Sequence, residues 1–140
     1  MTKVFHKLLV SAAVFCLYAC ASGAVFISED LTPAELIQRA QEASDKNRYK
    51  IALQYYKALY DRNSTNIDLI CAAEYEIAFI HYKQKKYAQS KTEFNDLLER
   101  YNTPDEENLP QQFKLLANKV LERINEYENR RRPFSRKPKN

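Results

Sequence analysis

Glycine is almost absent from this chain: Gly23 is the single one among 140 residues. Hairpin turns and phosphate-binding loops both depend on glycine, because it adopts left-handed backbone conformations without steric cost. The scarcity of glycine therefore excludes a β-rich fold and a phosphate-binding loop. The sequence is rich instead in Ala, Leu, Glu, Lys, Gln and Arg, which are good helix formers. We expect an all-α protein.

The apolar run at the N-terminus is too short to cross a membrane. Leu8 to Ala19 gives about twelve residues, whereas a spanning helix needs about twenty. Lys3 and Lys7 precede it, as in an export signal. The run ends in Leu17-Tyr18-Ala19-Cys20, which resembles the lipobox of bacterial lipoproteins. We expect residues 1–19 to be a lipoprotein signal peptide and Cys20 to be acylated, with palmitate among the attached fatty acids. The alternative is an ordinary signal peptide cut at Ala19 or Ala21.

Cysteine and histidine are too few for most catalytic or metal sites. Cys16 would leave with the signal peptide and Cys20 would carry lipid, so the mature chain has no partner for a disulfide to Cys71. Cys71 lies in an apolar helical stretch and is expected to be buried and inert. His81 has no cysteine or carboxylate at metal-ligand spacing and reads as a helix-surface residue. We expect no enzyme activity, no metal and no cofactor.

Apolar residues at helical spacing divide the remaining chain into five segments. The first begins at Thr32, which can cap a helix whose first residue is Pro33, and Glu35 can complete a capping box. The expected domain, residues 32–129, holds helix pairs at about 34–66 and 67–103 and a capping helix at about 109–129. Around it we expect the lipidated cysteine with a tether (20–31) and a basic, disordered tail (130–140).

The two helix pairs carry a repeat. Tyr49 recurs 38 positions later as Tyr87, and each tyrosine is followed by a small residue, an aromatic and a leucine at the same spacing: Ala52 and Ser90, Tyr56 and Phe94, Leu59 and Leu97. A small residue lets two helices approach closely, and an aromatic fills the space beneath it. The pattern resembles the tetratricopeptide repeat, which implies an α-α superhelix. Its period exceeds the usual value of about 34 by about one helical turn.

The second repeat resembles a narrower group. Its helices read AEYEIAFIHYK, then Tyr87, then FNDLLERY, similar to repeats of BamD and of the Tol-Pal-associated coordinator. Members of the BamD family are lipoproteins of the outer-membrane β-barrel assembly machine. The resemblance implies a protein-binding scaffold, an accessory of outer-membrane protein assembly that faces the periplasm, and Ala21 after the cysteine agrees with outer-membrane sorting. The alternatives are a Tol-Pal or cell-wall adaptor and a self-associating scaffold. The BamD family has more repeats than this chain has room for.

Binding residues follow from the tetratricopeptide resemblance, in which the first helix of each repeat lines a groove. By position the groove candidates are Gln38, Gln41 and Asp45 in the first repeat, and Tyr75, Glu76, Phe79, Tyr82 and Lys83 in the second. Three of them form an aromatic stripe at helical spacing, suited to an extended or apolar peptide: Tyr75, Phe79 and Tyr82. The alternative is that this stripe is core, packed against the capping helix.

Charge is distributed unevenly. Residues 130–140 hold six basic residues and no acid, whereas residues 20–128 hold 14 basic and 18 acidic ones. The basic end suits either lipid phosphates or simple solubilisation. The expected partners are one or more proteins, the β-barrel assembly complex by resemblance, and the membrane through the lipid on Cys20. The export signal argues against a nucleic-acid partner.

Overall fold

The computed structural model describes residues 25–104 and 106–131. Within these ranges the chain is helical and contains no strand, so the predicted all-α fold of two helix pairs and a C-terminal helix is confirmed. No helix in the described ranges is both long and apolar enough to span a bilayer. The predicted signal peptide, the acylated Cys20 and residues 132–140 of the predicted tail lie outside them.

The first helix pair is α2 (Pro33–Asp45) and α3 (Tyr49–Arg62). The predicted capping box is present at the start of α2: the Glu35 carboxylate accepts from Thr32 N at 2.9 Å, and Glu35 N donates back to Thr32 Oγ1 at 3.3 Å. These bonds satisfy backbone donors that a helix start otherwise leaves unpaired.

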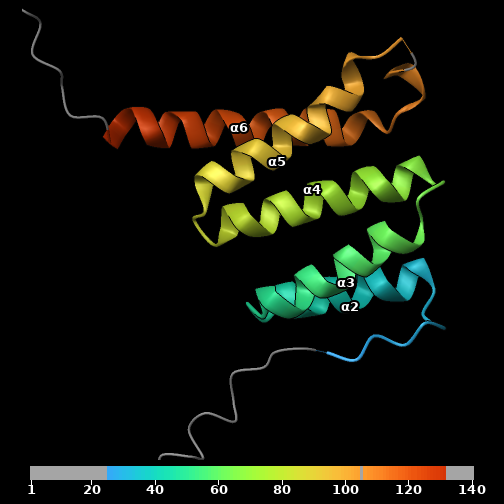
Figure 1. The fold of residues 1–140 in the computed structure, drawn as a ribbon. Helices are drawn as coiled ribbons and strands as arrows, with labels where there is room; N and C mark the ends of the chain where they lie inside the picture. The colour runs from blue at the N-terminus through green and yellow to red at the C-terminus, as the bar shows by residue number, and fades with distance from the viewer. Residues whose placement is uncertain (1–24, 105, 132–140) are drawn as a thin grey trace, which may run out of the picture.

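The second pair is α4 (Ile67–Lys83) and α5 (Tyr87–Glu99), which continues into a 3-10 turn, η1 (Arg100–Asn102). A second short turn, η2 (Glu106–Asn108), leads to α6 (Gln111–Arg131). The elements stack in chain order, with α2 and α3 at one end, α4 in the middle and α6 at the other end (Figure 1). The last helix includes Arg130 and Arg131, so it extends into the predicted tail.

The turns inside the two pairs are the same structure repeated. Asn47 and Lys85, 38 positions apart, both have positive φ, at 56° and 61°. In the first turn Arg48 N donates to Ala43 O at 2.8 Å, and in the second Lys86 N donates to His81 O at 2.9 Å. The companion bonds, from Asn47 N to Ser44 O and from Lys85 N to Tyr82 O, are both 2.9 Å long. Together the two bonds satisfy the last carbonyls of the helix, as in the Schellman motif. The repeat seen in the sequence is therefore also a repeat of backbone geometry.

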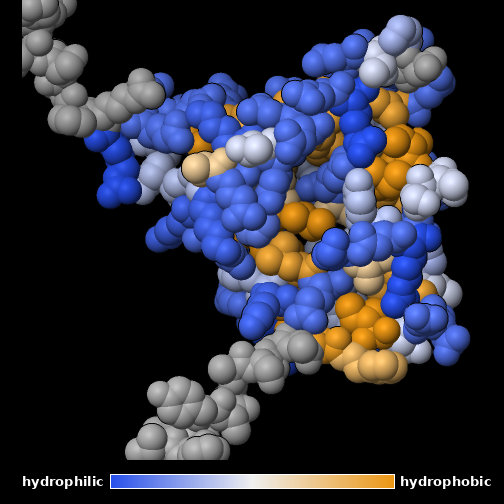
Figure 2. Space-filling view, viewed as in Figure 1, coloured by the Kyte–Doolittle hydropathy of each residue, from blue (hydrophilic) through white to orange (hydrophobic). Residues whose placement is uncertain are grey.

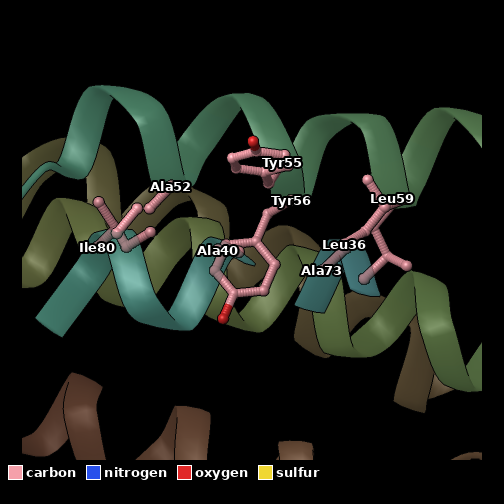
Figure 3. Close-up of a cluster of buried hydrophobic side chains, with 9 residues drawn as sticks. Leu36, Ala40, Ala52, Tyr55, Tyr56, Leu59, Ala73 and Ile80 are labelled. Atoms are coloured by element: carbon pink, nitrogen blue, oxygen red, sulfur yellow. The ribbon is translucent and has the colours of Figure 1, made fainter. Parts of the chain in front are cut away.

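The small residues of the repeat lie at the helix crossings. Ala52 and Ser90 have no exposed surface. Ser90 Oγ donates to Ala78 O on the facing helix at 2.9 Å, which requires close approach. In the first pair, Tyr56 points from α3 toward α2 beside Ala40, as Figure 3 shows. An alanine or serine at these positions lets the backbones approach while the aromatic fills the remaining space.

The core has two clusters, and α4 contributes to both. Toward the first pair it presents Ala73 and Ile80; toward α5 and α6 it presents Cys71, Tyr75 and Ala78. This explains why α4 is apolar on two sides rather than one: a helix in the middle of a stack has two faces to bury. The second cluster is completed by Ala117, Val120 and Ile124 of α6.

Residues 25–31, expected to be the end of a free tether, instead pack along the first helix pair. Val25, Ile27 and Leu31 are partly buried against the first cluster. The segment has no helical spacing because residues 25–28 belong to no helix and residues 29–30 form a turn, closed by a hydrogen bond from Leu31 N to Ser28 O at 3.4 Å. Its backbone is held by side chains of α3, among them Gln54 and Arg62.

Candidate protein-binding edge

One edge of α4 brings predicted groove residues of this helix next to the C-terminal end of α2. Lys83 Nζ donates to Ser44 Oγ of α2 at 3.1 Å and lies 5.1 Å from the ring centroid of Phe79. Asp45 follows Ser44 directly, and Glu76 lies two helical turns before Lys83. We call Ser44, Asp45, Glu76, Phe79 and Lys83 the inner edge.

The two acids of this edge, Glu76 and Asp45, act electrostatically on the same buried side chain. Burial raises the pKa of the Tyr56 hydroxyl, and the charges of Glu76 and Asp45 raise it further. Both carboxylates therefore lie near the same tyrosine. Burial also raises the pKa of Glu76, an effect that Lys83 partly offsets. The inner edge thus combines a partly desolvated acid with an exposed ammonium beside an aromatic ring.

The predicted aromatic stripe is largely a packing feature. Tyr75 is buried, with ring centroids 5.6 Å from Phe94 of α5 and 5.7 Å from Phe113 of α6. Phe79 stacks between Tyr75 and Tyr82, at 5.8 Å from each. The core alternative therefore describes Tyr75, whereas Phe79 and Tyr82 are half-buried. Phe79 is the stripe residue that the inner edge includes.

The first-repeat candidates do not all reach this edge. Gln38 is exposed and donates to the Glu42 carboxylate at 3.0 Å. It lines a separate hollow of about 480 Å³, formed by α2, α3 and their turn without any residue of α4. Asp45 belongs to the inner edge, and Gln41 is exposed on α2 and does not line the hollow. The structure thus brings Asp45 together with the candidates of α4 and separates Gln38 from them.

A crevice of about 350 Å³ on the other side of α4 was not anticipated. It lies between α3, α4 and α5 and is lined by Lys57, Tyr60, Glu74, Ile77, Glu93 and Asp96. Glu74 accepts two hydrogen bonds from Arg100 at 2.8 and 2.6 Å, and these bonds raise the pKa of the guanidinium. No sequence signal marked this crevice, because its lining residues come from three helices and are far apart in the sequence.

His81 is not the helix-surface residue expected from the sequence. Its exposed fraction is 7%, and its Nδ1 lies 2.6 Å from a Glu93 carboxylate oxygen on α5. The expectation considered only neighbours along the chain, whereas Glu93 is twelve positions away on the paired helix. Among residues 25–104 and 106–131, no group of three or more His, Cys, Asp or Glu side chains is arranged to hold a metal.

Cys71 is buried as predicted. Burial raises the pKa of its thiol, and a hydrogen bond with Tyr101 acts in the opposite direction. A thiol held in the protonated form is a poor nucleophile.

The surface of the helix stack is mostly hydrophilic on the face that Figure 2 shows, with apolar side chains visible between the helix layers.

Comparison with known proteins gives a relative but no function. The chain is 34% identical over 130 residues to a protein of Treponema pallidum (strain Nichols) described only as uncharacterized. The match covers 91% of this chain and 52% of that protein, so the chain spans about half the length of its relative. No protein-family model matches the chain. No solved structure matches it either.

Proposed function

We propose that this protein is a lipid-anchored scaffold of the bacterial envelope that binds a segment of a partner protein through the inner edge. The observation that carries the proposal is the duplicated helix pair with matching turns, since stacked helix pairs leave an exposed edge between repeats that other proteins use for peptide binding. By its sequence resemblance to the BamD family, we further propose an accessory role in outer-membrane protein assembly, with the chain anchored at the outer membrane and facing the periplasm.

The chemistry of the inner edge suits a polypeptide ligand. An ammonium has three donors, and the Lys83 ammonium gives one to Ser44, so others remain for a carboxylate or carbonyl of the partner. Phe79 is half-buried and offers an apolar contact beside it. Glu76 can accept a hydrogen bond from a backbone N–H, which would relieve its partial burial without a counter-ion.

Membrane attachment in this proposal depends on the sequence Leu17-Tyr18-Ala19-Cys20. Replacing Cys20 by serine should block acylation and leave the protein as uncleaved precursor or soluble material. Fatty-acid labelling of membrane fractions measures this directly. Labelled, membrane-bound mature protein from Cys20→Ser would contradict the anchoring proposal.

Partner capture tests the binding role. Solubilised membranes would be passed over the acylated protein, its Phe79→Ala/Lys83→Ala variant, and a Gln38→Ala control that alters only the separate hollow. We expect a β-barrel assembly component bound by the wild type and the control but lost from the double variant. Capture of a peptidoglycan-associated protein instead would favour the Tol-Pal type of adaptor. Equal capture by all three proteins would contradict the inner edge as the binding surface.

The double variant must remain folded for this comparison to hold. Lys83 is exposed, and Phe79 is half-buried at the margin of the second cluster, where it stacks on Tyr75, so the double variant should lose some stability but keep the fully buried core. Circular dichroism should therefore give a cooperative melt for all three proteins. A double variant that fails to melt cooperatively would be replaced by Lys83→Glu alone, which reverses the charge and keeps the aromatic contact.

A further inference from the structure

The extended segment before α2 is fixed to the protein body at two points. Val25 N donates to Gln54 Oε1 at 3.0 Å. Three carbonyls of the segment accept hydrogen bonds from the Arg62 guanidinium: Ser28 O at 2.9 Å, Ile27 O at 3.3 Å and Glu29 O at 3.5 Å. Both side chains come from α3. Residues 25–28 therefore follow the course of α3 and are held along it.

Phe26 faces away from this contact. Its neighbours Val25 and Ile27 turn toward the first cluster, whereas 91% of Phe26 is exposed. Alternate orientation is what an extended backbone imposes. The next most exposed large apolar side chain in the described ranges is Leu115, at 57%. A nearly fully exposed phenylalanine on a backbone held on both sides is unfavourable in water, because its ring has no apolar contact there.

The short distance to Cys20 limits where this phenylalanine can lie. Five peptide units join Cys20 to Val25, and an extended chain covers at most about 3.3–3.6 Å per residue. A lipid carried by Cys20 thus holds Val25 within about 18 Å of the bilayer interface. The segment lies at the α2–α3 end of the stack, and α6 lies at the opposite end (Figure 1). With a lipid on Cys20, Phe26 would therefore lie at the end of the molecule nearest the membrane.

We propose that Phe26 inserts into the interfacial region of the bilayer that holds the lipid on Cys20. This inference rests on the proposed acylation of Cys20. The lipid and the aromatic ring then form two points of attachment joined by a short chain. Because the chain around Phe26 is bound to α3, insertion of the ring fixes orientation as well as attachment. The first helix pair is held at the membrane, and α6 is directed away from it.

The absence of tryptophan makes the proposal directly measurable. Phe26→Trp and Leu115→Trp each introduce a single fluorophore, the first at the proposed insertion point and the second on α6 as the matched control. Both full-length proteins are produced with their signal, purified from membranes and reconstituted into phosphatidylcholine vesicles with or without brominated acyl chains. We expect emission shifted to shorter wavelength and several-fold quenching by brominated lipid for Phe26→Trp, and neither for Leu115→Trp.

The outcomes separate this inference from the proposed anchoring. Intact mass shows first whether Cys20 is acylated. An acylated protein whose Phe26→Trp fluorescence is not quenched overturns the insertion of Phe26 alone and leaves the exposed ring for a protein partner. Equal quenching of both variants overturns the fixed orientation. An unmodified Cys20 overturns the anchoring, and the insertion that depends on it.

Discussion

The two ends of the helix stack are closed in different ways. At the N-terminal end, the short extended segment 25–31 contributes Val25, Ile27 and Leu31 to the first cluster. At the C-terminal end, the 21-residue helix α6 contributes fully buried side chains to the second: Ala117, Val120 and Ile124. A repeat stack must cover the apolar face of each terminal unit. The comparison indicates that the C-terminal closure stabilises the fold more, while the N-terminal closure would position the lipid anchor that we propose on Cys20.

Truncation after Pro104 should have the largest effect. Without α6, the side chains of Tyr75, Phe94 and Tyr101 lose their cover, and burial of such groups is worth about 1.5–3 kcal/mol each before ordering entropy is subtracted. That loss rivals the usual stability of about 5–15 kcal/mol of a small domain. Circular dichroism of the truncated chain, made without the leader, should show no cooperative melt.

Deletion of residues 132–140 is the control for that truncation. It removes basic residues and leaves α6 complete, so the melting temperature should barely change. A cooperative melt that survives removal of residues 105–140 would mean that α6 is an arm available to a partner and not a required part of the fold.

The crossings of the two pairs give the next largest effect. Ala52 has no exposed surface, so Ala52→Leu should overpack α3 and cost about 1–3 kcal/mol. Ser90→Ala in the other pair keeps the volume nearly constant and removes the hydrogen bond to Ala78 O, at about 0.5–1.5 kcal/mol. Urea denaturation compares the two. A cost for Ala52→Leu below that of Ser90→Ala would contradict close approach in the first pair.

The repeat could be predicted from sequence because it depends on local spacing. Tyr49 and Tyr87, with the small residues three positions later, are visible in the chain, and the capping box at Thr32 and Glu35 involves only neighbouring residues. Helix ends and helix faces follow from such short-range patterns. The all-α fold, the order of its helices and their pairing could therefore be predicted from the sequence.

The candidate site was harder to predict from the sequence because its residues are distant from one another along the chain. Lys83 meets Ser44 across 39 positions, and Arg100 meets Glu74 across 26. Position within a repeat placed Gln38 with the other candidates, yet it lines a separate hollow formed by α2, α3 and their turn. Residues 25–31 were missed for the opposite reason: a segment outside any helix has no helical period, so its packing left no signal of the kind that marked the helices.

Substitutions in the two turns, at Asn47 and Lys85, should have a smaller effect and should stabilise the protein instead of destabilising it. A residue with a Cβ in the left-handed region costs roughly 1–2 kcal/mol, and asparagine tolerates that region better than lysine. Lys85→Gly should therefore raise the free energy of unfolding by up to about 1 kcal/mol, and Asn47→Gly by less. Lys85→Ala is the control, because it removes the charge but keeps the Cβ. A gain from Lys85→Ala equal to that from Lys85→Gly would assign the effect to charge instead.

The smallest effects contrast the two edges of α4 through Glu74 and Glu76. Glu74 accepts two hydrogen bonds from Arg100, so Glu74→Gln should cost roughly 0.2–1 kcal/mol, as expected for a partly exposed ion pair. Replacing Glu76 by glutamine should change the stability in the opposite direction. Its pKa is raised by burial, so the folded state holds the proton more tightly than the unfolded state, and stability is lost as pH rises through the folded pKa.

Glu76→Gln should therefore be slightly more stable than the wild type at neutral pH, and the two proteins should converge as pH falls toward the unfolded pKa of about 4.3. Glu74→Gln should be less stable than the wild type at neutral pH. Melting temperatures of the three proteins at several pH values between acid and neutral measure both signs at once. Two glutamates two positions apart would then have opposite effects because Glu74 gains a guanidinium on folding, whereas Glu76 loses water at the edge proposed to bind a partner. The contrary result is a Glu76→Gln variant that is less stable than the wild type at neutral pH. That result would mean that the Glu76 carboxylate already has a stabilising interaction in the folded protein that outweighs the cost of its burial. The argument that a partner's N–H compensates this cost would then be wrong.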